Sequence, residues 1–220
     1  MREAVKRLGR TGIAMLLLAV ASAPADAQTP MVAPLSGPDE PKVAPVKGED
    51  GLYHQSWFAV SFLDLREDLA DAHAKGKRFA VIFEQNGCIY CTKMHTEVLT
   101  LRYINDFVRE NFVIVQLDLW GAREVTDFDG AKMSEKKLAE RWGVMFTPTI
   151  VFYKDGPPPK GIFGPPLEVT RMSLGIGTFT FYDMFAWVRA KVYERDVNFQ
   201  RFHIARMNER EAAKKSSKSN

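Results

Sequence analysis

This 220-residue chain has two cysteines, which lie three positions apart in Cys88-Ile89-Tyr90-Cys91. This spacing suits thiol–disulfide exchange, in which one thiolate attacks a substrate disulfide and the second thiol then releases the substrate from the mixed disulfide. The same spacing also occurs in static disulfides and in half of a metal site. Haem attachment is excluded because Thr92, and not a histidine, follows the second cysteine. A multi-disulfide scaffold and a four-cysteine zinc site are excluded by the cysteine count.

The cysteine motif lies between a predicted strand and a predicted helix. Residues 79–83 form a short apolar run that ends at Asn86-Gly87, which is typical of a buried strand followed by a turn. A helix is expected from about 88 to 99. Its first turn places free N–H groups and the positive end of the helix dipole at Cys88, and both stabilise a thiolate. The pattern therefore predicts that Cys88 is the nucleophile and that Cys91 resolves the mixed disulfide.

The rest of the chain alternates between strand and helix patterns. Apolar runs predict further strands, and apolar residues at helical spacing predict further helices. The strands are expected at 112–117, 149–153 and 167–174, and the helices at 62–74, 103–110, 134–142 and 178–194. This alternation with short connections predicts an α/β domain with a largely parallel central sheet.

The two ends of the chain differ from the middle. Residues 1–27 have a basic start, a short apolar run and Ala25-Asp26-Ala27, which predicts a cleaved signal peptide and export to the periplasm. Residues 28–50 are rich in proline and are expected to be a linker. The domain is expected over 51–198, followed by a basic tail over 199–220 that is either solvated or in contact with anionic lipid. A net charge of +3 gives no support for nucleic-acid binding.

Three segments together resemble the thioredoxin superfamily: Phe79-Ala80-Val81-Ile82-Phe83, the Cys88–Cys91 motif, and Gly143-Val144-Met145-Phe146-Thr147-Pro148-Thr149. The resemblance implies a thioredoxin-like fold, with a central mixed sheet flanked by helices, an insert at about 120–133 before the third helix, and a C-terminal extension. It implies a cis proline at Pro148 that forms a substrate shelf with Thr147 beside Cys88. Ile89, Tyr90 and Thr147 would contact the substrate, a protein disulfide. No organic cofactor and no metal are then needed.

A narrower similarity points to exported SoxW-type thioredoxin-like proteins. It is carried by residues 83–91, by Lys93-Met94-His95 and by Asp127-Phe128-Asp129-Gly130. This similarity implies that the protein reduces disulfides and receives electrons from a membrane thiol donor. Three alternatives remain open: a disulfide oxidant or isomerase, a Cu(I)-handling chaperone, and a redox-inert module whose disulfide is structural.

The residue that would accept the proton of Cys91 differs from the one in the superfamily pattern. The buried aspartate of thioredoxin corresponds to Ile82 here, and Glu84 lies two residues further along the same strand. Alternate residues of a strand share a face, so Glu84 is a candidate base for Cys91, directly or through water. The alternative is a solvated carboxylate at the end of the strand. Unchanged pH–rate behaviour in Glu84→Gln would exclude the first interpretation.

Two more side chains are candidates for a role at this site. His95 follows Cys91 by four residues and so shares its helix face. It is either the third ligand of a soft-metal site with both cysteines or a partly exposed helical side chain. Trp120 opens the predicted insert and is the best candidate for an exposed aromatic contact with a partner.

Overall fold

The computed structural model describes residues 33–157, 160–173, 177–195 and 198–218. The predicted signal peptide lies outside these residues. The strands are β1 (Val46–Lys47), β2 (Tyr53–His54), β3 (Arg78–Glu84), β4 (Phe112–Asp118), β5 (Glu124–Thr126), β6 (Lys132–Ser134), β7 (Thr149–Tyr153) and β8 (Glu168–Ser173). The helices are α1 (Leu65–Ala74), α2 (Ile89–Lys93), α3 (Arg102–Asn111), α4 (Glu135–Arg141), α5 (Gly164–Leu167), α6 (Thr178–Arg189) and α7 (Phe199–Lys218), with a π-helical turn at Met94–Val98 and a 3-10 turn at Val192–Arg195.

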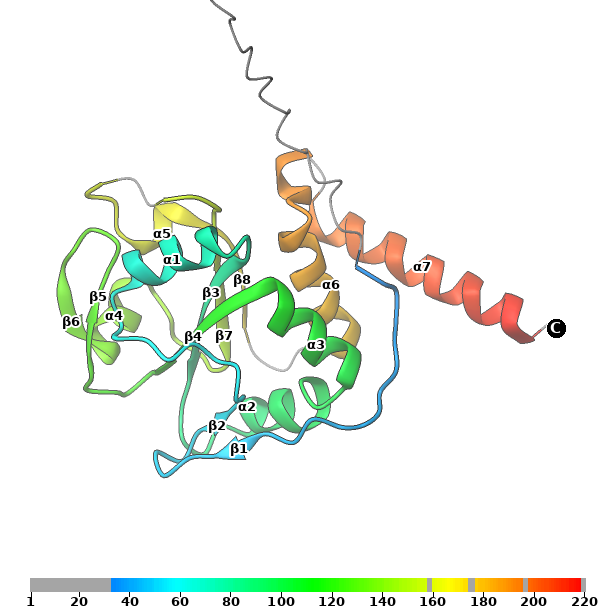
Figure 1. Ribbon diagram of the computed structural model, residues 1–220, viewed down its shortest axis with the longest axis horizontal. Coiled ribbons are helices and arrows are strands. Elements are labelled where there is room, and N and C mark those ends of the chain that lie inside the picture. The colour runs from blue at the N-terminus through cyan, green and yellow to red at the C-terminus, as the bar shows by residue number, and fades with distance from the viewer. Residues whose placement is uncertain (1–32, 158–159, 174–176, 196–197, 219–220) are drawn as a thin grey trace, which may run out of the picture.

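The central sheet has the strand order β4-β3-β7-β8 (Figure 1). Only β3 and β4 are parallel, whereas β7 pairs antiparallel with both β3 and β8. The prediction of a largely parallel sheet from strand–helix alternation is therefore wrong, and the mixed sheet implied by the thioredoxin resemblance is confirmed. The connection from β7 to β8 contains only the four-residue α5 as a helix, and β8 returns antiparallel beside β7.

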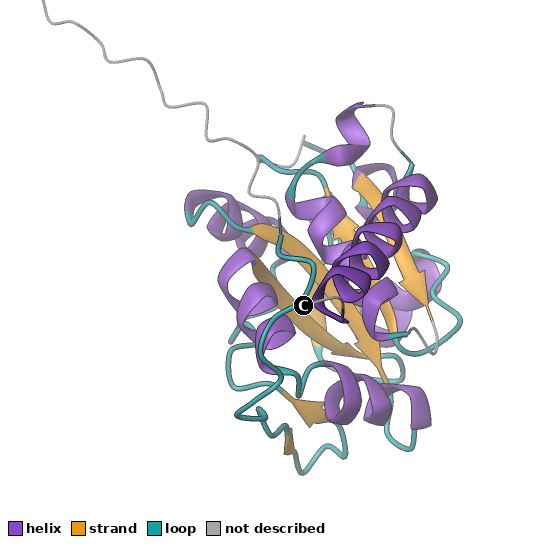
Figure 2. Cartoon of the chain, turned by 90° about the vertical axis from the view of Figure 1, so that its right-hand side faces the viewer, coloured by secondary structure: helices purple, strands orange, loops and turns teal. Residues whose placement is uncertain are grey.

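Side chains of the sheet alternate between two hydrophobic cores, as the two-residue period of a strand requires. On one face, Ala80 and Ile82 pack with residues of α3 and α6, while on the other face Phe79, Val81 and Phe83 pack with residues of α1 and α4. All seven residues of β3 are buried, because helices cover both faces of the sheet (Figure 2). This double coverage explains why β3 reads as a continuous apolar run rather than as an alternating pattern.

The predicted insert is a small β-hairpin packed at the side of the domain. Strands β5 and β6 pair antiparallel, and Thr126 forms a bridge with Asp64 just before α1. Asp127 is fully buried, where its carboxylate accepts hydrogen bonds from the Trp142 indole and the Gly164 N–H. The hairpin is thus fastened to α4 and α5 and keeps its residues at a fixed place on the sheet edge.

Both ends of the described chain pack on the domain, which differs from the expectation of a linker and a solvated tail. Residues 33–50 run past α7 and α3 to β1 (Figure 1), and the N–H groups of Arg102 and Tyr103 bond to carbonyls of this segment. Helix α7 packs against α6, and Arg206 donates to the carbonyls of Ala33 and Pro34. Proline has no backbone N–H, so the prolines of residues 33–50 reduce the number of N–H groups in this segment that need hydrogen-bond partners.

Candidate functional site

The cysteine pair and the Thr147-Pro148 segment meet because β3 and β7 are antiparallel neighbours. Phe83, near the end of β3, pairs with Thr149 at the start of β7. The chain leaves β3 toward Cys88 and enters β7 through Thr147 and Pro148, so both loops lie at the same edge of the sheet. The peptide bond between Thr147 and Pro148 is cis, and both side chains are buried.

Cys88 and Cys91 form a disulfide at the beginning of α2. Cys88 is the N-cap residue of the helix, and its sulfur accepts a hydrogen bond of 3.0 Å from the backbone N–H of Cys91. The preceding Gly87 turns the chain into α2 with a φ of +76°, a conformation that glycine adopts without steric cost. When the pair is reduced, the same N–H can donate to a Cys88 thiolate and stabilise it.

The two sulfurs are unequally accessible. Cys88 is 8% exposed and Cys91 is 3% exposed. Between them, Ile89 and Tyr90 are exposed, with relative accessibilities of 70% and 49%. Two exposed apolar side chains thus stand beside two cysteines that are both largely buried, Cys88 slightly less so than Cys91.

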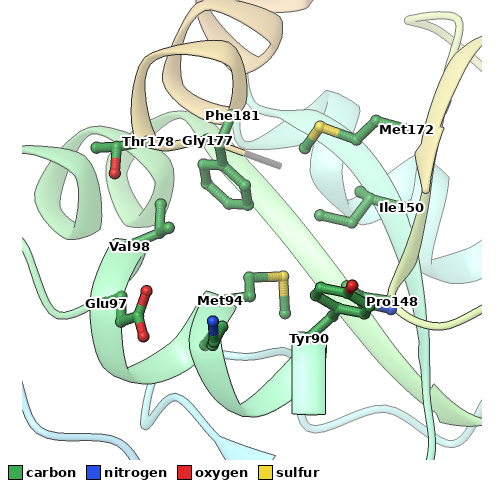
Figure 3. A pocket seen from close by; sticks show the side chains of 11 residues that line it. Tyr90, Met94, Glu97, Val98, Pro148, Ile150, Met172, Gly177, Thr178 and Phe181 are labelled. Atoms are coloured by element: carbon green, nitrogen blue, oxygen red, sulfur yellow. The ribbon is translucent and has the colours of Figure 1, made fainter. Parts of the chain in front are cut away.

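A cavity of about 240 Å³ opens next to the disulfide and runs under the start of α6. Figure 3 shows Tyr90 and Pro148 at one end of this cavity and the apolar side chains of Met94, Met172 and Phe181 around it. Glu97 and Thr178 add polar groups at the opposite side. The cavity is thus a recess with apolar and polar walls that reaches Tyr90 between the two cysteines, and its size suits a side chain of a bound protein.

Further large apolar side chains are exposed on the loops around the disulfide. Together with Ile89 and Tyr90 they form what we call the apolar rim, whose other members are Trp120, Met145 and Phe146, with 63%, 74% and 53% exposure. Met145 and Phe146 directly precede Thr147. The indole of Trp120 donates a hydrogen bond of 3.0 Å to Gln85, in the loop that leads to Cys88. Exposed apolar groups gathered on one side of a protein indicate a surface for a protein partner.

Glu84 is buried, so the interpretation as a solvated carboxylate at the strand end is wrong. Its side chain is 1% exposed, and its two carboxylate oxygens lie 2.9 and 3.1 Å from Nε2 of His95. A second cavity, of about 140 Å³, is lined by Glu84 and by both cysteines. This space is large enough for water to connect the carboxylate with Cys91.

His95 is fully buried and does not form a metal site with the cysteines. Its Nε2 contacts Glu84 and its Nδ1 lies 3.2 Å from Nε2 of Gln55, so both ring nitrogens already have partners. Across the part of the chain that the structure describes, no group of three His, Cys, Asp or Glu side chains is arranged to hold a metal ion. The two interpretations from sequence, a metal ligand and a partly exposed side chain, are therefore both replaced by a buried hydrogen-bonding role.

Sequence reasoning missed the polar residues behind Glu84 and the apolar residues of the cavity. Gln55 and Asn105 carry no motif, and polar side chains are expected at the surface until a structure shows otherwise. Met172 and Phe181 lie far from the cysteines in sequence and reach them only because β8 and α6 border the same cavity. Only the spacing of Met94, three residues after Cys91, offered a signal for its place beside the site.

Comparison with known proteins gives the fold. Residues 65–165 match the family model described as a thioredoxin-like domain. A thioredoxin-fold protein from Helicobacter pylori is 17% identical, with a TM-score of 0.51, and the match covers 67% of this chain and 97% of that one. The chain thus has the thioredoxin fold, and residues 65–165 are similar to the thioredoxin-like domain family.

Two other solved structures are similar over a shorter part of the chain. A thioredoxin from Thermus thermophilus is 26% identical, covers 57% of this chain and 83% of that one, and has a TM-score of 0.43. The C-terminal domain of DsbD from Neisseria meningitidis is 13% identical, covers 55% of this chain and 90% of that one, and has a TM-score of 0.37. No curated protein matches the sequence.

None of the helices among the described residues combines the length and the apolar character that a membrane crossing requires.

Proposed function

We propose that the protein is a thiol–disulfide oxidoreductase that reduces disulfides in exported partner proteins. The observation that carries this proposal is the position of the Cys88–Cys91 disulfide. It lies at the start of a helix, at the same end of the sheet as the Thr147-Pro148 segment, and Tyr90 between the two cysteines lines a cavity together with Pro148. A purely structural disulfide has no need of exposed apolar side chains around it.

The reaction has two steps, and each exchanges one sulfur–sulfur bond for another. In the first, the Cys88 thiolate attacks one sulfur of the substrate disulfide, which forms a mixed disulfide and releases the other substrate sulfur as a thiolate that takes a proton from solvent. In the second, Cys91 loses its proton and attacks Cys88, which closes the Cys88–Cys91 bond and releases the second substrate thiol. The substrate gains two electrons, and the protein dithiol loses them.

Glu84 is the proposed acceptor for the proton of Cys91. Cys91 is the more buried sulfur, so its proton has little access to bulk water. Glu84, the last residue of β3, lines the small cavity that Cys91 also lines. A positioned base of this kind typically accelerates a proton-transfer step by about 10² to 10⁴.

The apolar rim and the cavity of Figure 3 are the proposed substrate surface. Pro148 forms part of the cavity wall, and Thr147 lies between it and Phe146 of the rim. A substrate segment lying there would place an apolar side chain in the cavity while its disulfide faces Cys88. Ile89 and Tyr90 would contact the same segment.

The proposed location is the periplasm, to which the predicted signal peptide would direct the chain. Disulfides form and persist there, so a reductant needs a continuous supply of electrons. We propose a membrane thiol donor that transfers a dithiol's two electrons to the Cys88–Cys91 disulfide. This role agrees with the resemblance of residues 83–95 to SoxW-type proteins.

Turnover of insulin with dithiothreitol as donor tests the activity. We expect the wild-type protein to accelerate the precipitation of the insulin B chain and Cys88→Ser to show no acceleration. Phe146→Ala should raise KM for insulin, whereas Phe62→Ala, at a fully exposed phenylalanine outside the rim, should leave KM unchanged. A wild-type protein without turnover would refute the proposal and favour the redox-inert module.

A further inference from the structure

A chain of buried polar side chains runs from the active site into the domain. Glu84 contacts Nε2 of His95, and Nδ1 of His95 lies 3.2 Å from Nε2 of Gln55. Oε1 of Gln55 accepts a hydrogen bond of 2.9 Å from Asn105, whose Oδ1 accepts one of 3.0 Å from the indole of Trp57. The proposed function uses only the first member of this chain, Glu84.

Two groups of fixed polarity, the indole N–H of Trp57 and the carbonyl of Leu99, determine the direction of every bond in this chain. An indole N–H can only donate, so the Asn105 atom facing it is the carbonyl oxygen. The Asn105 amide nitrogen then donates both to the carbonyl of Leu99, at 2.8 Å, and to Oε1 of Gln55. These bonds leave the amide nitrogen of Gln55 as the donor toward His95.

The tautomer of His95 follows from that direction. Since Gln55 donates to Nδ1, this nitrogen carries no proton, and the ring proton is on Nε2. Nε2 therefore donates to the Glu84 carboxylate, whose two oxygens lie at 2.9 and 3.1 Å. A second ring proton, on Nδ1, would face the amide protons of Gln55 and lose a buried hydrogen bond.

We propose that His95 is a positioning residue for Glu84: locked as the Nε2–H tautomer, it donates to the carboxylate, fixes its place beside the small cavity and leaves Glu84 as the proton-accepting member of the pair. This inference rests on the proposed function, since it concerns the step in which Cys91 resolves the mixed disulfide. There, the Cys91 proton passes to Glu84, the Cys91 thiolate bonds to Cys88, and the substrate leaves as a thiolate. That thiolate takes up one proton, and Glu84 later returns the Cys91 proton to solvent.

Few other ionisable groups lie near the pair. Tyr53 of β2 stacks on the His95 ring, with 6.0 Å between ring centroids, and Cys91 lies one helical turn before His95. Lys47 of β1 lies over Tyr53 at the border of the small cavity. From β4, Asp118 is paired with Glu84 in the strand register. Glu135 of α4 is also buried at this end of the sheet, where it accepts hydrogen bonds from the Asp118 N–H and from Arg123. Of the two buried carboxylates, Glu84 is the one that lines the cavity of the cysteines.

The tautomer is tested directly by the ¹⁵N chemical shifts of the His95 ring in the full-length protein. We expect a protonated Nε2 and an unprotonated Nδ1 at neutral pH, in both the oxidised and the reduced protein. In Asn105→Ala, which removes the group that orients the Gln55 amide, we expect signals of both tautomers. An imidazolium at neutral pH, or a proton on Nδ1, would overturn the proposal.

The effect on the reaction is tested with the reduced protein and dithiobis(nitrobenzoate), which releases one coloured thiolate at each step. His95→Leu should slow the second step by about tenfold and shift its pH profile, with the first step unchanged. His95→Gln, which retains an N–H donor for Glu84, should recover most of the rate. His73→Leu, at a histidine that bonds Asp155, is the matched control and should match the wild type.

The outcomes separate this inference from the function on which it rests. If Glu84→Gln and both His95 variants leave the second step unchanged, the role of Glu84 is refuted. If Glu84→Gln slows the step and both His95 variants leave it unchanged, only the positioning role of His95 is refuted. If His95→Leu does not fold, the ¹⁵N chemical shifts of wild-type His95 and the rate of the second step in His95→Gln still test the positioning role.

Discussion

The docking of α7 depends on a single buried carboxylate, and Asp183→Asn tests it. Asp183 of α6 is fully buried and accepts hydrogen bonds of 2.6 to 2.7 Å from Arg206, Arg210 and His203. The two arginines are 4% and 5% exposed. Removal of one partner from a buried ion pair costs about 3–5 kcal/mol, because the remaining charge stays buried without compensation. Asp183→Asn leaves the charges of both arginines buried, so we expect the free energy of unfolding to fall by an amount in this range.

The pH dependence of that loss follows from the pKa of Asp183. Burial by itself would raise this pKa, but the hydrogen bonds from Arg210, Arg206 and His203 outweigh burial and lower it below 3.8. A carboxyl whose pKa is lower in the folded state stabilises the fold above its unfolded pKa. That stabilisation is lost as the pH falls through the folded pKa. The difference in unfolding free energy between wild type and Asp183→Asn should therefore be largest at neutral pH and shrink below about pH 4.

Urea unfolding measures the stability difference, and trypsin cleavage of α7 reports its release from the domain. Asp50→Asn is the control, because Asp50 pairs with His54 at the surface with about half of its side chain exposed. It should change stability by no more than about 1 kcal/mol. An Asp183→Asn protein as stable as this control, with α7 equally resistant to trypsin, would refute the reasoning.

Two further predictions concern the surface of α1 and the apolar rim. Burial raises the pKa of Asp68 to about 6, despite a hydrogen bond from Ser61. Ionised Asp68 therefore destabilises the fold above that pH, and urea unfolding of Asp68→Asn should show a gain of about 1–2 kcal/mol at pH 8 that disappears near pH 4; an equal gain at both pH values would contradict this cause. Trp120→Ala should lower kcat/KM for insulin but not for dithiobis(nitrobenzoate), with stability changed by about 0.5 kcal/mol or less; equal effects on both substrates would exclude a role in protein recognition.

Much of the central fold could be predicted from the sequence because its elements have strong local signals. The run at 79–83 and the capping Ser134 locate β3 and α4 to within a residue or two. The strand directions could not be predicted from alternation, since the connection between β7 and β8 carries too little local information. Residues 33–50 and α7 are ordered by contacts between segments more than 170 positions apart, such as Arg206 with Ala33, which no local pattern reveals.

The reactive pair could be predicted, whereas its surroundings could not. Spacing alone brings Cys91 beside Cys88 at the start of a helix, and the structure shows them as a disulfide there. The place of Glu84 on the same face as Ile82 also follows from the strand period. Its burial does not, because it depends on His95 from the active-site helix and on Gln55 from the segment after β2, which approach Glu84 only in the folded domain.

The reduction potential of the Cys88–Cys91 pair tests the central claim most directly. The purified protein is equilibrated with glutathione buffers of graded ratio, and the reduced fraction is determined by thiol alkylation. A disulfide reductant should have a potential near that of thioredoxin, about −270 mV. A value near that of a strong oxidant, about −120 mV, would contradict the reductive role, and a pair that does not exchange with glutathione would contradict the oxidoreductase itself.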